Sequence, residues 1–370
     1  MDMSIRFPGI QLTLDYVGKS IRIFGFEITI YGILIAVGML LGIAFVVLEA
    51  KRSSQNQNLY LDMVILALIF GVLGARLYYV GCTWSLYKGN ILEIMNTRNG
   101  GMAIYGGIFG GTLAAAAFCR IRKLPFGQMA DTASMGLLIG QIIGRWGNFF
   151  NRESFGEYTD QVFAMQLPLS AVRSGEVTAG MRENLVTVDG ISYIQVHPVF
   201  LYESLLCLLL FLVLLARRRR KRYQGEIFMR YLAGYALIRF FMELLRSDKL
   251  LIPGTGIPIS LCVSVILFVV FRIIITVRCI MAKKREATRR RRREERYEAE
   301  ERAAAEEEER EQKQARAEIS GNEHSVHEED GAAAWETGTV LPDANAAEAV
   351  EPQDSKQERS AEESQDQPEA

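Results

Sequence analysis

The chain has 370 residues, of which 49% are hydrophobic, and its formal net charge is −1. Its three histidines and five cysteines show no CxxC or Cys/His metal-ligand spacing, which argues against a zinc hydrolase or a Ser-His-Asp enzyme. This nearly neutral charge gives no reason to expect a nucleic-acid partner. The average composition also conceals two different parts. Long apolar runs occupy the chain up to about residue 282, and charged or small residues make up the rest.

Seven apolar runs are long enough to be membrane-span candidates, for which about 18 residues are needed. Only helices or closed barrels satisfy every backbone group in lipid, and these runs lack the alternation of barrel strands. The sequence therefore predicts an all-α integral membrane protein with seven transmembrane helices. The predicted spans are Ile28–Leu48, Leu59–Val80, Ala103–Cys119, Met129–Trp146, Val199–Ala216, Ile227–Leu245 and Ile259–Met281.

Lysine and arginine in the short loops predict the orientation of these spans, since such residues collect on the cytoplasmic side. Basic segments follow spans one, three, five and seven, as KR (51–52), RIRK (120–123), RRRRKR (217–222) and KKREATRRRRR (283–293). The N-terminus is thus expected outside and the C-terminus in the cytoplasm. Residues 1–27 lack the basic start and the cleavage site of a secretory signal, so we expect the first span to be retained.

Two regions lie outside the predicted spans. The outer loop 148–196 has alternating apolar positions and a DG turn signal, which predict short strands or a hairpin in a small cap that is either a docking surface or a lid. The charged tail 283–370 contains one stretch suited to a solvated helix but is otherwise too poor in apolar residues to bury a core. We therefore predict a membrane domain over 1–282 and a largely disordered cytoplasmic tail.

Polar side chains within the spans are the first candidates for a site, because ionisable groups in lipid are costly. Arg145 and Arg239 are hard to explain without a functional site. Arg76 and Arg246 could instead extend their charged groups from a helix end to the lipid headgroups. Glu203 and Glu243 are the expected acidic partners of these arginines. Tyr31 and Tyr105 alone would be ordinary interface tyrosines. On the predicted topology, every one of these side chains falls in the outer half of the membrane or at its outer edge.

An excess of arginine at this depth predicts an anionic guest, and the planar guanidinium suits phosphate oxygens. An anion reached from within the bilayer indicates a phospholipid headgroup. The glycine-rich stretch NGGMAIYGGIFGG (99–111) is not a phosphate loop, since it lacks the GK[ST] ending. Its small-xxx-small spacing predicts close helix packing instead.

The segment GRWGNFFNRESFG (144–156) carries a resemblance to a known family. It resembles the signature of prolipoprotein diacylglyceryl transferases, Gly-Arg-x-Gly-Asn-Phe-x-Asn-x-Glu-x-x-Gly, at every fixed position. The likeness extends over roughly residues 15–280 through YGILIAVG (31–38), GARLYYV (74–80), HPVFLYE (197–203) and RFFMELLR (239–246).

The resemblance implies an enzyme of the bacterial plasma (inner) membrane that needs no cofactor. Such an enzyme moves the diacylglyceryl group of phosphatidylglycerol to the lipobox cysteine that follows a prolipoprotein signal peptide. It leaves a thioether and releases glycerol 1-phosphate. Its expected partners are therefore phosphatidylglycerol, a prolipoprotein and the surrounding membrane lipids.

The resemblance also implies roles for single residues. Arg145 and Asn148 match the essential arginine and asparagine of the signature, and Arg239 matches an arginine important for catalysis. Other matched positions are Asn151, Glu153, Gly156, Tyr31 and Arg76. The chain departs from the family at Tyr105, where well-studied members have a histidine proposed as the base for the thiol. We therefore predict that Arg145 and Arg239 bind the phosphate with support from Arg76, and that Tyr105 is a candidate proton relay.

A rival interpretation is a transporter or a lipid-binding protein that holds an anion without chemistry. No inverted repeat is evident in the sequence, and the polar residues considered above stop short of the predicted inner half, so no continuous path is visible. Transfer chemistry is the interpretation that the sequence favours.

Overall fold

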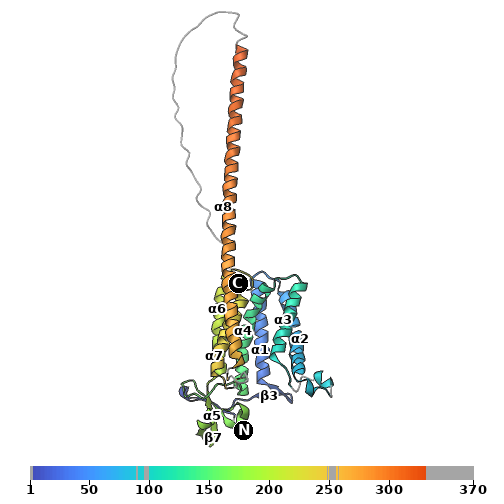
Figure 1. Cartoon of the computed structure of the whole chain (residues 1–370), viewed down its shortest axis with the longest axis vertical. Helices are drawn as coiled ribbons and strands as arrows, with labels where there is room; N and C mark the ends of the chain where they lie inside the picture. Colours follow the sequence, from blue (N-terminus) through green and yellow to red (C-terminus); the bar gives the residue numbers. More distant parts are fainter. Residues whose placement is uncertain are drawn as a thin grey trace, which may run out of the picture. The chain divides into compact units, whose positions relative to one another are not determined.

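The computed structural model describes residues 3–88, 91–95, 100–247, 249, 256 and 258–330. Within these residues, a long helix lies over each of the seven predicted spans. Figure 1 labels them α1 (Ile30–Arg52), α2 (Gln57–Cys82), α3 (Ile104–Ile121), α4 (Phe126–Asn151), α6 (Val199–Arg217), α7 (Glu226–Leu245) and α8 (Ile259–Asp330).

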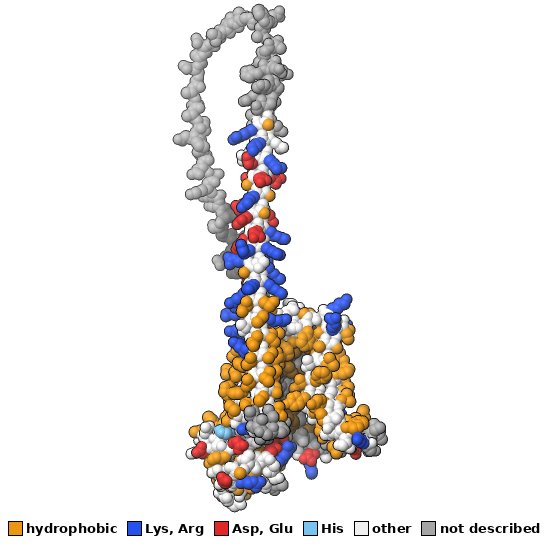
Figure 2. Space-filling view, in the orientation of Figure 1, with side chains coloured by type: hydrophobic (Ala, Val, Ile, Leu, Met, Phe, Trp, Pro, Cys, Tyr) orange, Lys and Arg blue, Asp and Glu red, His pale blue; other side chains and the backbone are white. Residues whose placement is uncertain are grey.

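Five of these helices, α1, α2, α3, α6 and α8, are long and apolar enough to cross a membrane. Helix α4 is rich in small and polar residues, and α7 carries Arg230, Arg239 and Glu243, so both are less apolar. Apolar side chains cover the visible flanks of the helices in the bundle, as expected where lipid replaces water, whereas charged side chains cover the later part of α8 (Figure 2). The chain is a multi-pass membrane protein, and the count of seven spans with an outside N-terminus stays a prediction.

Glycines bring α2 and α3 into close contact. A side chain at Gly106 would put its Cβ 2.3 Å from the carbonyl oxygen of Gly74, so the two backbones leave no room for one. This confirms the close packing predicted from the small-xxx-small spacing. Helix α4 packs against α1, α6 and α7, and it therefore brings the signature segment at its C-terminal end among several other helices.

A small cap of strands gathers at the end of the helices where α1 begins (Figure 1). Its five-stranded antiparallel sheet has the order β2-β1-β5-β7-β6 and a core that includes Ile5, Leu167 and Ile194. The hairpin expected at the DG turn is present as β6–β7. The strands are β1 (Ile5–Phe7), β2 (Leu12–Leu14), β5 (Met165–Pro168), β6 (Val186–Val188) and β7 (Ile191–Val196), and a short helix α5 (Ala179–Glu183) precedes β6.

The N-terminal segment has more structure than the sequence analysis assigned to it. It supplies β1 and β2 to the cap, and it then forms a separate hairpin of β3 (Ser20–Ile23) and β4 (Phe26–Thr29). These strands are too short to stand out from the apolar runs around them, and the cap sheet joins them to partners far along the chain.

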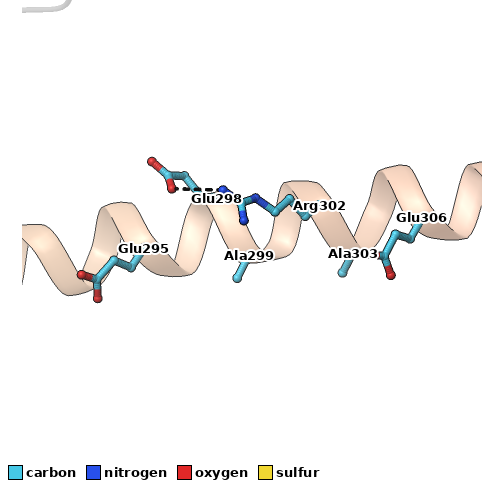
Figure 3. A pocket seen from close by; sticks show the side chains of 6 residues that line it. All are labelled: Glu295, Glu298, Ala299, Arg302, Ala303 and Glu306. Atoms are coloured by element: carbon cyan, nitrogen blue, oxygen red, sulfur yellow. Dashed lines mark ion pairs between the residues drawn. The ribbon is translucent and has the colours of Figure 1, made fainter.

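The chain divides into two compact units, Met1–Arg290 and Arg291–Ala370. The predicted boundary after residue 282 falls inside α8, which runs without a break to Asp330, and residues 331–370 lie outside the described residues. Pairs such as Arg302 with Glu298, 3.9 Å apart and drawn in Figure 3, support this solvated helix. The shallow depression in that view is lined by α8 alone. The two-domain description stays a prediction.

Candidate functional site

The signature segment forms the last two turns of α4 and the bend that follows them. The helix ends because Arg152 adopts a left-handed conformation with φ 54°, and its amide donates to the carbonyl of Phe149 at 3.2 Å. The side-chain nitrogens (Nδ2) of Asn148 and Asn151 both donate to Oε1 of Glu153, at 3.2 and 3.4 Å. The two signature asparagines therefore hold the signature glutamate, and together they fix the bend.

One turn earlier in α4, Arg145 meets a buried glutamate from α6. Nη2 of Arg145 lies 2.7 Å from Oε1 of Glu203, whose side chain is 0% exposed. The hydroxyl of Tyr235, on α7, donates to the same Oε1 at 3.1 Å and accepts from Arg145 at 3.3 Å. Three helices thus each place one polar side chain at a common point.

Arg239, one turn further along α7, completes this cluster. Its Nη2 bonds Oε2 of Glu243 at 3.0 Å, the i,i+4 pair that the sequence predicted. Its Nη1 lies 3.9 Å from Oε2 of Glu203, so the two arginines share one carboxylate. We call Arg145, Glu203, Tyr235, Arg239 and Glu243 the arginine cluster.

The arginine cluster keeps donors that its acids do not use. The hydrogen bonds and the ion pair of Arg145 among the described residues all involve Nη2, so Nε and Nη1 remain available. The side chains of Arg145 and Arg239 are 22% and 21% exposed, although Glu203 is completely buried. A guanidinium with one edge held and another edge open suits a bidentate anion such as phosphate.

The bend after α4 is clamped between the start of α6 and the end of α7. The amide of Gly156 donates to the carbonyl of His197 at 3.0 Å, and the amide of Glu157 donates to the carbonyl of Leu245 at 2.9 Å. A Cβ at Gly156 would lie 2.7 Å from both His197 and Leu245, which explains why the signature ends in glycine. Burial lowers the pKa of His197, so its ring is neutral at neutral pH and adds no charge here.

Arg246 and Tyr31 contact this region from its edges. Nη2 of Arg246 lies 3.3 Å from the hydroxyl of Ser154, and the Arg246 backbone bridges to Gly156. The ring of Tyr31, at the start of α1, covers Gly147, where an added Cβ would come within 2.3 Å of the ring. The second glycine of the signature therefore leaves the space in which an aromatic ring from α1 packs.

Arg76 has surroundings different from those predicted for a phosphate ligand. Its guanidinium is buried and donates to the backbone carbonyls of Glu93, Ile94, Gly100 and Gly101 at 2.7 to 3.0 Å. It also lies over the ring of Tyr87. Arg76 thus holds the connection between α2 and α3 in place.

Tyr105 lies on α3 and is 70% exposed. Among the described residues, its hydroxyl makes no hydrogen bond to the arginine cluster. Its predicted role as a proton relay stays a prediction.

Sequence reasoning missed three parts of this arrangement. Tyr235 was not among the predicted site residues, because a tyrosine in an apolar helix is usually a packing residue. Its i,i+4 spacing to Arg239 nevertheless places both side chains on one face of the helix. Arg152 was missed too, and it donates from a buried guanidinium to the carbonyls of Met3 and Val17 at 2.7 and 2.6 Å. At the opposite end of α4, Asp131 caps the start of α7 by accepting from the amide of Phe228 at 3.0 Å. The expectation that ionisable groups gather at one end only was therefore incomplete.

Within the described part of the chain, no group of three or more histidine, cysteine, aspartate or glutamate side chains is arranged to hold a metal ion. The polar groups at the site are guanidinium, carboxylate, amide and phenol, which recognise anions and move protons.

The chain is similar to proteins of known name over most of its apolar part. Residues 19–277 match the family model described as prolipoprotein diacylglyceryl transferase. A phosphatidylglycerol–prolipoprotein diacylglyceryl transferase of Clostridioides difficile is 40% identical over 63% of this chain and 84% of that protein. Proteins of the same name from Finegoldia magna and Bacillus mycoides are 37% and 34% identical, over 67% and 72% of this chain and 91% and 94% of their own lengths. The chain therefore belongs to the prolipoprotein diacylglyceryl transferase family.

Proposed function

We propose that this transferase moves the sn-1,2-diacylglyceryl group of phosphatidylglycerol to the cysteine thiol in the lipobox of a prolipoprotein. The cysteine sulfur forms a bond to the glyceryl carbon, and the bond from that carbon to the phosphate oxygen breaks. The thiol gives up its proton, and glycerol 1-phosphate leaves. The names of the similar proteins supply both substrates.

One observation carries the chemistry, namely that Arg145 and Arg239 converge on the buried carboxylate of Glu203. The leaving phosphate gains negative charge as the carbon–oxygen bond breaks, and preorganised cations at that position lower the barrier. Glu203 and Glu243 orient the two guanidinium groups, and the remaining donors of the arginines bind the phosphate. Removing a donor of this kind costs about 100- to 1,000-fold in rate.

The thiol must also become a thiolate, and its ordinary pKa lies near 8.5. The arginines favour the thiolate electrostatically, so a weak proton acceptor is sufficient. The departing phosphate oxygens are one acceptor. Tyr235 offers a relay, because its hydroxyl donates to Glu203 and passes its own proton to that carboxylate as it accepts one, whereas Tyr105 is exposed. We favour Tyr235 over Tyr105 as the phenol that assists the transfer.

The other signature residues act by holding the site together. Asn148, Asn151 and Glu153 fix the bend, and Gly156 lets it pass between its neighbours. Tyr31 and Arg246 support the same region from α1 and from the end of α7, and either side chain also has the chemistry to contact the lipid headgroup. Arg76 is a positioning residue for the segment before α3.

We further propose seven spans with an outside N-terminus in the bacterial plasma membrane, which puts the arginine cluster in the outer half of the bilayer. Phosphatidylglycerol then reaches the cluster from within the membrane. The lipobox cysteine approaches from the outer face, beneath the cap.

The direct test is incubation of the purified protein with phosphatidylglycerol and a lipobox peptide, followed by mass spectrometry. We expect the cysteine of the peptide to gain the mass of the diacylglyceryl group and glycerol phosphate to appear in equal amount. A peptide with serine in place of the cysteine is the matched control. Binding of phosphatidylglycerol without any mass gain would favour the rival lipid-binding or transport function.

A further inference from the structure

The hairpin of β3 and β4 is amphipathic, and its apolar face is exposed. The strand register pairs Ile21 with Ile28 and Ile23 with Phe26. Directly paired residues of antiparallel strands point to the same face, so these four side chains form one apolar face. All four are exposed, and Phe26 is 72% exposed.

The opposite face of the hairpin is polar. It carries Ser20, Arg22, Glu27 and Thr29, and the hydroxyl of Ser20 donates to Oε1 of Glu27 at 2.5 Å. A two-stranded hairpin is at best marginally stable in water by itself, and an exposed apolar face adds a cost there. The pattern resembles that of an amphipathic segment at a lipid surface, which has one apolar face and one polar, charged face.

The turn of this hairpin gives a second, independent indication. Phe24 and Gly25 both have positive φ, at 50° and 82°, and Phe24 is 97% exposed. A bulky residue is disfavoured in this conformation, and turns of this kind prefer asparagine, aspartate or glycine. Phe24 therefore strains the turn while contributing almost no contact within the fold.

The chain itself contains the polar version of the same turn. The hairpin β6–β7 turns at Asp189 and Gly190, with φ of 51° and 79°. The backbone geometry thus accepts the favoured Asp-Gly pair in the cap, whereas phenylalanine takes the first position in the β3–β4 hairpin. What distinguishes the two turns is the apolar character of Phe24 and not the backbone.

The hairpin also lies where a membrane span begins. Strand β4 ends at Thr29, whose side chain accepts from the amide of Gly32 in the first turn of α1. The amide of Ile30 is bonded to the carbonyl of Lys19 at 3.0 Å, which closes the base of the hairpin against the helix. The end of a span marks the boundary between hydrocarbon and headgroups, so the apolar face of the hairpin starts at that depth.

We propose that the β3–β4 hairpin is an anchor at the lipid interface. Phe24 and the face formed by Ile21, Ile23, Phe26 and Ile28 insert into the boundary between acyl chains and headgroups. The polar face, with Arg22, meets the headgroups and water. Because the hairpin runs directly into α1, the anchor fixes the depth of Tyr31, whose ring seats Gly147 of the signature. This inference rests on the chain being a membrane protein and not on its proposed reaction.

Tryptophan scanning of the full chain in phosphatidylglycerol–phosphatidylcholine vesicles tests the anchor. The variants are Phe24→Trp and, as the matched control at the equivalent turn position in the cap, Asp189→Trp. The three native tryptophans give a background common to both variants. We expect lipids brominated near the headgroup end of their chains to quench most of the emission added by Phe24→Trp and little of that added by Asp189→Trp. Phe26→Trp is expected to follow Phe24→Trp.

The result that would overturn the anchor is equal quenching of Phe24→Trp and Asp189→Trp by brominated lipid, with both open to the aqueous quencher acrylamide. Protection of Phe24→Trp from acrylamide that grows with the protein-to-lipid ratio, without quenching by brominated lipid, would identify a second copy of the chain as the occupant instead. Phe24→Asn separates anchoring from folding, because asparagine favours the turn. It is expected to leave the thermal unfolding midpoint in detergent unchanged or raised.

Discussion

Glu203 has no exposed surface, yet its carboxylate meets arginines from two different helices. Such a buried charge is tolerated only while its partners are present, and removing one partner of a buried pair typically costs about 3–5 kcal/mol, a large part of a typical protein stability of about 5–15 kcal/mol. Arg145 and Arg239 therefore have a structural role as well as the proposed chemical one. Loss of activity in an arginine variant has to be separated from loss of fold.

At the same scale, the two candidate tyrosines make different predictions. We expect Tyr235→Phe to lower the rate of transfer about tenfold or more, because the hydroxyl that joins Arg145 to Glu203 is lost. Tyr105→Phe should retain near-normal activity, since its side chain is exposed. The measurement is the initial rate of peptide modification by each purified variant.

A large loss in Tyr105→Phe together with normal activity in Tyr235→Phe would reverse this assignment. Tyr105→His provides a further control, because it restores the residue type of the better-studied relatives. A gain in rate from Tyr105→His would show that position 105 faces the thiol during the reaction.

At the scale of helices, the contact between α2 and α3 depends on single glycines. A Cβ at Gly106 would lie 2.3 Å from the oxygen of Gly74, whereas one at Gly107 would meet its nearest atom at 3.5 Å, an ordinary contact. We expect Gly106→Ala to destabilise the protein by about 1–3 kcal/mol through overpacking, and Gly107→Ala to have little effect. Thermal unfolding in detergent measures both.

These neighbouring glycines make a matched pair, since either substitution adds the same methyl group to the same helix. Equal unfolding midpoints for the two variants would mean that the helices separate easily and that their close approach is not needed for stability.

The sequence predicted the helices far better than the cap. Long apolar runs end where charged loops begin, so α1 and α6 could be read directly from composition. The N-terminal strands could not, because β1 finds its partner β5 more than a hundred residues later and has only three residues of its own. A pairing over that distance leaves no local signal in the sequence.

The sequence analysis named most residues of the arginine cluster but not the contacts between them. Motif and depth together pointed to Arg145, Arg239 and Glu243, and the structure brings these three to one cluster. Depth and the family resemblance also suggested Arg76, yet its guanidinium donates to backbone carbonyls. Whether an arginine meets a substrate or a loop depends on the path of the chain around it, which spacing does not reveal.

At the scale of the whole molecule, the family match ends at residue 277 and the first compact unit ends at Arg290. All members of the arginine cluster lie within that unit. We therefore expect a chain truncated after Arg290 to transfer the diacylglyceryl group at close to the rate of the full chain. The measurement is the peptide assay with equal amounts of reconstituted protein.

A truncated protein that folds, enters the membrane and yet fails to modify the peptide would mean that the tail takes part in substrate capture. Normal activity in vesicles with a defect only in cells would instead assign the tail to partners or to targeting.

The most direct measurement of the proposed chemistry is the transfer rate of Arg145→Ala and Arg239→Ala in vesicles of phosphatidylglycerol. Arg182→Ala is the matched control, because Arg182 is exposed on the cap helix α5. We expect the molecules of both cluster variants that remain folded in the membrane to lose about 100-fold or more in rate, and Arg182→Ala to remain fully active. An Arg239→Ala protein that keeps most of its activity would contradict the assignment of the arginine cluster to the lipid phosphate.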